Sequence, residues 1–329
     1  MTKPSSSQGT LFAATADELA PAAPNADDRR LAAELPPGVR FGAMSWTFPG
    51  WRGLVYDHDV NVKRLAKAGL PAYAQHPLLQ AVEIDRSYYE PLPAPSYREL
   101  AGQVPEPFRF VVKAHEECML RRFPPHARYG KKRGEANPRY LDAAYATDAV
   151  VAAVCEGLGA KLGAILFQFP PQDAGGPRQF TDELGAFLMR LPRGVPYAVE
   201  LRNPELLTAR YAAALTASGA LHCHNVWGEM PPLLVQAKRI PPEARRPLVV
   251  RWLLRRGDNY ESARARFEPF DRLSEEDAEN REAIARLVAK AAAHDVPALV
   301  LVNNTAEGCA PESIARLARA IAERASRRV

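Results

Sequence analysis

Cysteine is scarce in this sequence and shows no metal-binding spacing. The chain has 329 residues and four cysteines, and no two of them form a CxxC pair. The missing spacing argues against a zinc knuckle, and the lack of short-range pairing favours a reducing compartment. The chain also lacks a basic start followed by an apolar block, so we expect no secretory signal. These features predict a cytoplasmic protein.

Long hydrophobic runs and nucleotide-binding motifs are missing as well. No run of about 18 uncharged apolar residues is present, which predicts that the chain does not cross a membrane. No GxGxxG turn follows the first predicted strand, and no catalytic-triad signature is found. We therefore identify no cofactor. The net charge of +5 permits an anionic ligand without identifying one.

The first 37 residues differ in composition from the rest of the chain. They are rich in Ser, Ala and Pro, and such a segment buries little apolar surface. We predict a flexible amino-terminal tail over residues 1–37 and a single domain over residues 38–329. No linker interrupts the second range.

Eight short apolar segments recur after the tail and alternate with helical patterns. Continuous apolar runs are typical of parallel strands that are buried on both faces. Eight strands alternating with helices predict an α/β protein with the (β/α)8 TIM-barrel fold, with a doubly wound open sheet as the alternative. The segments span residues 40–46, 80–85, 108–114, 162–169, 196–202, 220–226, 247–253 and 297–304.

Polar side chains gather where these segments end. In a TIM barrel the carboxyl ends of all strands face one mouth, where active sites lie. Each such residue alone is typical of a solvated loop or a turn, but the placement recurs at seven strands. We predict that most of these groups line one pocket. They are Trp46, Glu83, Asp85, Lys113, His115, Gln168, Glu200, Arg202, Asn203, His222, His224, Asn225, Arg251, Asn303 and Asn304.

Six separated motifs resemble one known family. They are GAMSWTFPGWRGLVY, VEIDRSYY, FRFVVKAHE, LGAILFQFPP, AVELRNP and LVNNTAEGCAPES. In this order they resemble the YecE-like family, also called domain of unknown function 72, over residues 40–327. The resemblance implies a TIM barrel and a pocket rather than a particular reaction. The chain departs from the family pattern at the seventh strand, where Leu253 replaces a usual His. In the third-strand loop, His115 and His126 are both candidates for another usual His.

The first hypothesis is an enzyme, a hydrolase or a lyase, that acts on a small anionic, phosphorylated or sugar-like substrate. Glu83 and Glu200 are the acid–base candidates, because a carboxylate at a partly dry mouth can have a raised pKa. Lys113 is expected to pair with Glu83. If it were unpaired in an apolar pocket, it would instead be a Schiff-base nucleophile.

The remaining strand-end groups are predicted to hold the substrate. Arginine binds a carboxylate or phosphate through its planar guanidinium group, and amides hydrogen-bond hydroxyls or an oxyanion. The aromatic rings would either pack the top of the barrel or form a stacking floor. The predicted substrate-binding residues are Trp46, Tyr88, Gln168, Arg202, His224, Arg251, Asn303 and Asn304.

A metal site is one alternative. Carboxylates and imidazoles at strand ends are ligand types for a divalent metal, as in barrels related to endonuclease IV. The neighbouring Lys and Arg residues would oppose a cation, so no metal ligand is assigned. The residues in question are Glu83, Glu200, His115, His222 and His224.

Nucleic-acid binding is the other alternative. The loop over residues 121–139 holds seven Lys or Arg residues and one acid, interleaved with stackable rings. The same loop could instead close as a lid over a small ligand. The candidate nucleic-acid contacts are Arg121, Arg122, Lys131, Lys132 and Arg133.

Overall fold

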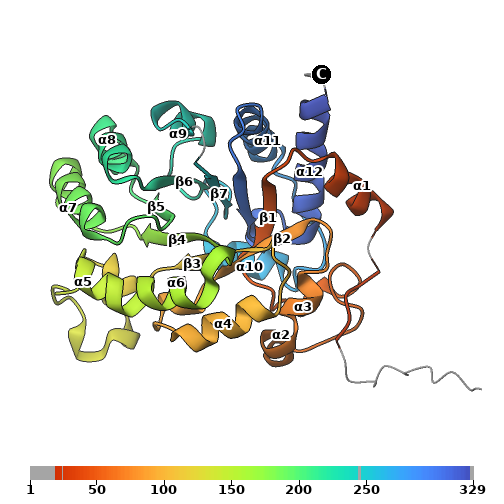
Figure 1. Cartoon of the computed structure of the whole chain (residues 1–329), viewed down its shortest axis with the longest axis horizontal. Helices are drawn as coiled ribbons and strands as arrows, with labels where there is room; N and C mark the ends of the chain where they lie inside the picture. The colour runs from red at the N-terminus through yellow and green to blue at the C-terminus, as the bar shows by residue number, and fades with distance from the viewer. Residues whose placement is uncertain (1–18, 24, 244–245, 327–329) are drawn as a thin grey trace, which may run out of the picture.

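A closed barrel of eight parallel strands forms the centre of the protein (Figure 1). The computed structural model describes residues 19–23, 25–243 and 246–326. Neighbouring strands pair in chain order, and the last strand pairs with the first. The predicted TIM barrel is confirmed, and every predicted strand is present. The strands are β1 (Val39–Ala43), β2 (Leu79–Ile84), β3 (Arg109–Lys113), β4 (Leu162–Phe169), β5 (Tyr197–Leu201), β6 (Leu221–Val226), β7 (Leu248–Trp252) and β8 (Ala298–Val302).

Alternation along the strands separates two apolar cores. Side chains two residues apart share one face of a strand. The outward faces pack against the surrounding helices and form the larger core, which includes Phe110, Phe167 and Trp252. The inward faces form a smaller core, which includes Ala81, Val111, Ala164, Ala198, Cys223, Val249 and Leu301. On β2, β3, β7 and β8 the next inward-facing residues, Glu83, Lys113, Arg251 and Asn303, line the cavity at the mouth.

Gly42 lets β1 approach β2 closely. A Cβ atom at this position would lie 2.1 Å from the carbonyl oxygen of Ala81. The register between the two strands also shifts here, between Phe41 and Gly42. A larger residue at this position would push the first two strands apart, because no L side chain fits that space.

Helices surround the outside of the barrel, and α10 (Tyr260–Phe267) instead lies over its centre (Figure 1), where Ala263 and Phe267 join the inner core. Several begin with a side-chain cap. Asn61, Asn259 and Asp277 each accept a hydrogen bond from a backbone N–H in the first turn. The helices are α1 (Ala26–Glu34), α2 (Val62–Ala68), α3 (Leu70–Tyr73), α4 (Ala94–Gly102), α5 (Ala143–Ala146), α6 (Ala152–Leu158), α7 (Pro177–Arg190), α8 (Ala209–Ser218), α9 (Leu233–Arg239), α10 (Tyr260–Phe267), α11 (Ala278–Ala292) and α12 (Ala310–Ser326).

The predicted tail over residues 1–37 is wrong in its second half. Residues 1–18 lie outside the described part of the chain. Residues 26–34 form α1, which packs against α12 and buries Leu31. Composition alone suggested a tail because the partner of this short helix lies almost 300 residues further along the chain.

One helix within the described residues is long and apolar enough to cross a membrane by length and composition alone. It spans Ala143–Lys161 and joins α5, a π-helical turn and α6. Its α6 part packs against α4, where Gly157 brings the two helices together. Its apolar side chains therefore have packing partners in the fold.

Candidate active site

A cavity of about 990 Å³ opens at the carboxyl ends of the strands. Closure of the barrel brings its lining together from strands that are far apart in the sequence. Of the eleven residues predicted to be catalytic or substrate-binding, eight line this cavity. They are Trp46, Glu83, Tyr88, Lys113, Gln168, Arg202, Arg251 and Asn303.

Arg251 lies at the base of the cavity and joins two carboxylates. Its Nη2 atom donates to Oε1 of Glu83 at 2.9 Å, and its Nη1 atom donates to Oε2 of Glu200. Nη2 also lies 3.5 Å from the sulfur of Met44. The side chains of Arg251, Glu83 and Glu200 are at most 3 % exposed. Because all three are removed from water, the network depends on this mutual pairing.

The pKa values of the two carboxyl groups shift in opposite directions. Burial raises the pKa of Glu83 and outweighs the opposing attraction of Arg251 and Lys113. Burial would also raise the pKa of Glu200, but Arg251 and Arg202 together lower it below its ordinary value. Two carboxylates with opposite pKa shifts are typical of a site that separates a proton donor from a fixed anion. Glu83 is therefore suited to proton transfer, and Glu200 to holding the arginines.

Lys113 pairs with a different carboxylate from the one predicted. Its Nζ atom donates to Oδ1 of Asp85 at 2.6 Å rather than to Glu83. The ammonium also lies 4.0 Å from the ring centroid of Tyr88, a cation–π contact. A lysine held this way is not the unpaired amine that Schiff-base chemistry requires.

Arg202 is held on three sides at the cavity wall. Its Nε atom donates to Oε1 of Glu200 at 3.0 Å, and its Nη2 atom donates to Oε1 of Gln168 at 3.1 Å. The guanidinium lies 3.8 Å from the ring centroid of Trp227. Within the described residues, its Nη1 atom makes no hydrogen bond. Arg202 therefore presents one oriented donor group to a ligand.

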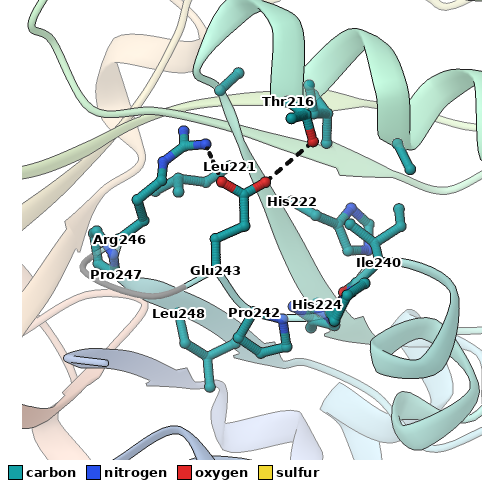
Figure 2. Close-up of a pocket in the computed structure, with 14 residues that line it drawn as sticks. Thr216, Leu221, His222, His224, Ile240, Pro242, Glu243, Arg246, Pro247 and Leu248 are labelled. Atoms are coloured by element: carbon teal, nitrogen blue, oxygen red, sulfur yellow. Dashed lines mark hydrogen bonds and ion pairs between the residues drawn. The ribbon is translucent and has the colours of Figure 1, made fainter. Parts of the chain in front are cut away.

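His224 does not reach the cavity, and this corrects its prediction as a binding residue. His222 and His224 lie on the outward face of β6, because Cys223 between them faces the inner core. Figure 2 shows both rings at a separate outer pocket of about 30 Å³. Nε2 of His224 donates to the carbonyl of Ile240 at 3.1 Å, and Nδ1 of His222 lies 3.1 Å from the Tyr211 hydroxyl.

The two terminal asparagines also separate by strand alternation. Asn303 lines the cavity, as predicted. Asn304 faces the other way and is buried, so its prediction as a substrate contact is wrong. Its Oδ1 atom accepts from the backbone N–H of Ala310 at 2.8 Å and from Nε1 of Trp51 at 3.3 Å. Asn304 therefore fixes the start of α12.

The proposed metal-ligand set is not brought together. Glu83 and Glu200 are paired with Arg251, and His222 and His224 lie outside the barrel. Nδ1 of His115 lies 2.7 Å from the hydroxyl of Tyr145. Among the described residues, no group of three His, Cys, Asp or Glu side chains is arranged to hold a metal ion.

The basic loop after β3 is largely neutralised by carboxylates. Arg121 pairs with Glu183 at 2.8 Å, and Lys132 pairs with Glu117 at 3.6 Å. Two further cations of the loop, Arg128 and Arg139, pair with Glu116 and Glu117. Arg122 and Arg133 donate to backbone carbonyls within the loop.

The same loop reaches the rim of the cavity. The guanidinium of Arg128 lies 5.2 Å from the ring centroid of Tyr89, which lines the cavity. This contact agrees with the lid interpretation of the loop better than with a free basic surface.

Two residues of the site were not selected from the sequence. Asp85 was recognised as a strand-end residue but not as the partner of Lys113. The spacing of Glu83 and Asp85, two residues apart, was the available signal, since it places both on one face. Trp227 follows β6 and supports Arg202, and nothing in its local sequence indicates this contact.

A known protein family and two solved structures are similar to this chain and have the same fold. The model of the family described as "Protein of unknown function DUF72" matches residues 40–328. A DUF72 family protein from Enterococcus faecalis is 19 % identical, with 86 % of this chain and 95 % of that chain covered and a TM-score of 0.61. A DUF72 family protein from Thermotoga maritima is 18 % identical, with 87 % and 99 % covered and a TM-score of 0.57. No curated protein matches this chain.

Proposed function

This chain belongs to the DUF72 family, and we propose that it is an enzyme in which Glu83 acts as a general acid on a hydroxylated, sugar-like substrate. One observation carries the proposal. Glu83 lines the cavity, burial raises its pKa, and its Oε2 atom has no hydrogen-bond partner among the described residues. A protonated carboxyl group at a substrate cavity is the state that general-acid catalysis requires.

The proton of Glu83 would pass to the leaving oxygen of the substrate as its bond to carbon breaks. The resulting carboxylate would be stabilised by Arg251, whose Nη2 atom lies 2.9 Å from Oε1 of Glu83, and this limits the cost of forming a charge in a buried place. Hydrolysis and elimination share this step. Asp85, whose side chain is 43 % exposed, would accept the second proton. In a hydrolase this proton comes from a water whose oxygen bonds to the same carbon, and in a lyase it comes from the neighbouring carbon as a double bond forms between the two.

The charges of the site favour hydroxyl groups over several phosphates. Lys113 and Arg251 each have a carboxylate partner, and Arg202 shares Glu200. The Nη1 atom of Arg202 would still bind one carboxylate or phosphate group of a substrate. The rings of Trp46 and Tyr88, which line the same cavity, would stack on the apolar face of a sugar.

The test compares substrates whose leaving groups differ in their need for a proton. Alkyl glycosides leave as strongly basic alkoxides and need an acid, whereas 2,4-dinitrophenyl glycosides do not. We expect Glu83→Gln to lower turnover of an alkyl glycoside at least ~100-fold, which is the lower end for general-acid catalysis, and to spare the dinitrophenyl glycoside. Glu106→Gln, at a carboxylate that is 82 % exposed, is the matched control.

The pH dependence gives a second readout. Because the acid must be protonated, turnover should fall as the pH rises through the raised pKa of Glu83. The proposal fails if a panel of alkyl glycosides, with and without an acidic substituent, is not turned over. It also fails if Glu83→Gln affects both leaving groups equally.

A further inference from the structure

The cavity does not end at the barrel mouth. It continues between α2 and α4, two neighbouring helices of the outer ring (Figure 1). We call this extension the α2–α4 groove. Its lining consists of Ala66, Lys67, Leu92, Ser96, Glu99, Leu100 and Gln103.

One face of α4 forms a wall of the groove. Ser96, Glu99, Leu100 and Gln103 have the spacing i, i+3, i+4 and i+7, which places them on the same side of the helix. This wall runs for about 10 Å, because a helix rises 1.5 Å per residue. The whole cavity is near the upper end of the roughly 300–1,000 Å³ that is usual for ligand pockets.

Packing explains why the two helices leave a groove. A Cβ atom at Gly157 of α6 would lie 2.4 Å from the Cβ of Tyr97 in α4, so glycine lets α4 sit tightly against α6. On the other side, Nε1 of Trp46 donates to the carbonyl of Leu65 at 3.0 Å and ties α2 to the mouth. Each helix is thus fixed by a contact that does not involve the other.

We propose that the α2–α4 groove binds the distal units of a linear oligosaccharide whose reacting unit lies at Glu83. This inference rests on the proposed function and names its substrate class. Ser96 and Gln103 offer both donors and acceptors to hydroxyl groups. Leu92 and Leu100 offer apolar surface to the faces of sugar rings.

The charge of the groove agrees with a chain of largely uncharged units. Lys67 and Glu99 are its charged residues among those described, and they have opposite signs. A polyphosphate backbone would require a surplus of cations along its path. The groove lacks that surplus, so the oligosaccharide fits better than a nucleic acid.

The experiment measures affinity against chain length. Linear α-1,4- and β-1,4-linked glucose oligomers of one to six units are titrated into the Glu83→Gln protein by calorimetry. For one of the two linkages, we expect the dissociation constant to fall at least ~10-fold between one and four units, or 1.4 kcal/mol. It should then level off once the groove is filled.

Two matched tryptophan variants test whether the increase in affinity with chain length arises in the groove. Ser96→Trp fills the groove and should abolish the dependence on length, so that oligomers of every length bind with equal affinity. Arg98→Trp is on the same helix but lies at the surface, 59 % exposed and paired with Glu156, and should keep the dependence. Thermal unfolding of both variants checks that they fold.

The outcomes separate this inference from the proposed function. Length-dependent binding that Ser96→Trp abolishes supports the groove, even if Glu83→Gln retains turnover and the acid role fails. Equal affinity at every length, or no binding by either series, overturns the groove while the turnover test stands on its own. Binding of a peptide ladder in place of both sugar series would also overturn it.

Discussion

The cavity network and the basic loop after β3 are both rich in charge, yet burial makes them behave differently. Arg251 and its two carboxylates are at most 3 % exposed, whereas Arg128, Lys132 and Arg139 of the loop are 39–60 % exposed. The cations of the loop pairs are exposed to water, which screens them, so each pair contributes less to stability than a fully buried pair. In the cavity, every charge depends on its partner. The comparison shows that charge density in a sequence indicates a site only where the fold removes water.

The largest effect is expected from breaking the buried network. Arg251→Met leaves Glu83 and Glu200 buried without their shared cation, which should lower the free energy of unfolding by roughly 3–5 kcal/mol. Urea denaturation at neutral pH measures this loss. Arg98→Met removes an exposed pair that is 59 % and 65 % exposed, and should cost under ~1 kcal/mol. Similar losses for the two variants would contradict the comparison.

A second effect extends the comparison to the buried histidines behind β6. Burial lowers the pKa of His224 to about 4, from about 6.5 in an unfolded chain. The fold therefore favours the neutral ring. The contribution of this preference to the free energy of unfolding is fully present above pH 6.5 and is lost as the pH falls towards 4. The difference corresponds to about 3 kcal/mol.

The measurement is urea denaturation at a series of pH values between 7 and 4. His224→Gln removes the titrating ring, so its stability should depend less steeply on pH than that of the wild type. The two proteins are compared by the slope of the free energy of unfolding against pH. The free energy at pH 7 alone is not used, because the variant also loses the hydrogen bond to Ile240. If the free energy of unfolding depended on pH equally for both proteins, the lowered pKa of His224 would be contradicted.

A smaller effect is expected at the aromatic support of Arg202. Trp227→Ala removes the ring that lies 3.8 Å from the guanidinium, so substrate affinity should fall by about 0.5–2 kcal/mol. Trp227→Phe keeps a ring and should lose less. Calorimetric titration with a methyl glycoside measures both. An unchanged affinity for Trp227→Ala would show that Arg202 needs no support from this ring.

The smallest effect is expected in the loop. Replacing Arg122, Lys131 and Arg133 by Ser should change the free energy of unfolding by less than ~0.5 kcal/mol, as is usual for surface sites. Retention on immobilised single-stranded DNA and RNA should be the same for the variant and the wild type. Salt-sensitive retention that only the wild type shows would instead support the nucleic-acid hypothesis.

Much of the fold and of the candidate site was predictable from local pattern. The eight apolar segments indicated the barrel, because a parallel strand covered on both faces must be apolar throughout. Barrel geometry then placed Glu83, Lys113 and Arg251 at one mouth. The wrong predictions concern which face of a strand a residue lies on and which ion-pair partner it takes. Asn304 and His224 are each one position out of phase with the inward face, and Lys113 pairs with Asp85 rather than Glu83.

Hydrophobic periodicity is a local property of the chain, so the order of strands and helices and the chemical groups at each strand end can be read from the sequence. Which of those groups face the lumen, and which partner each one takes, depends on how the barrel closes. The opposite pKa shifts of Glu83 and Glu200 follow from this arrangement. They depend on burial and on Arg251, which is more than 50 residues away from either carboxylate in the chain. Neither the burial of these side chains nor their arginine partner can be predicted from a short stretch of sequence.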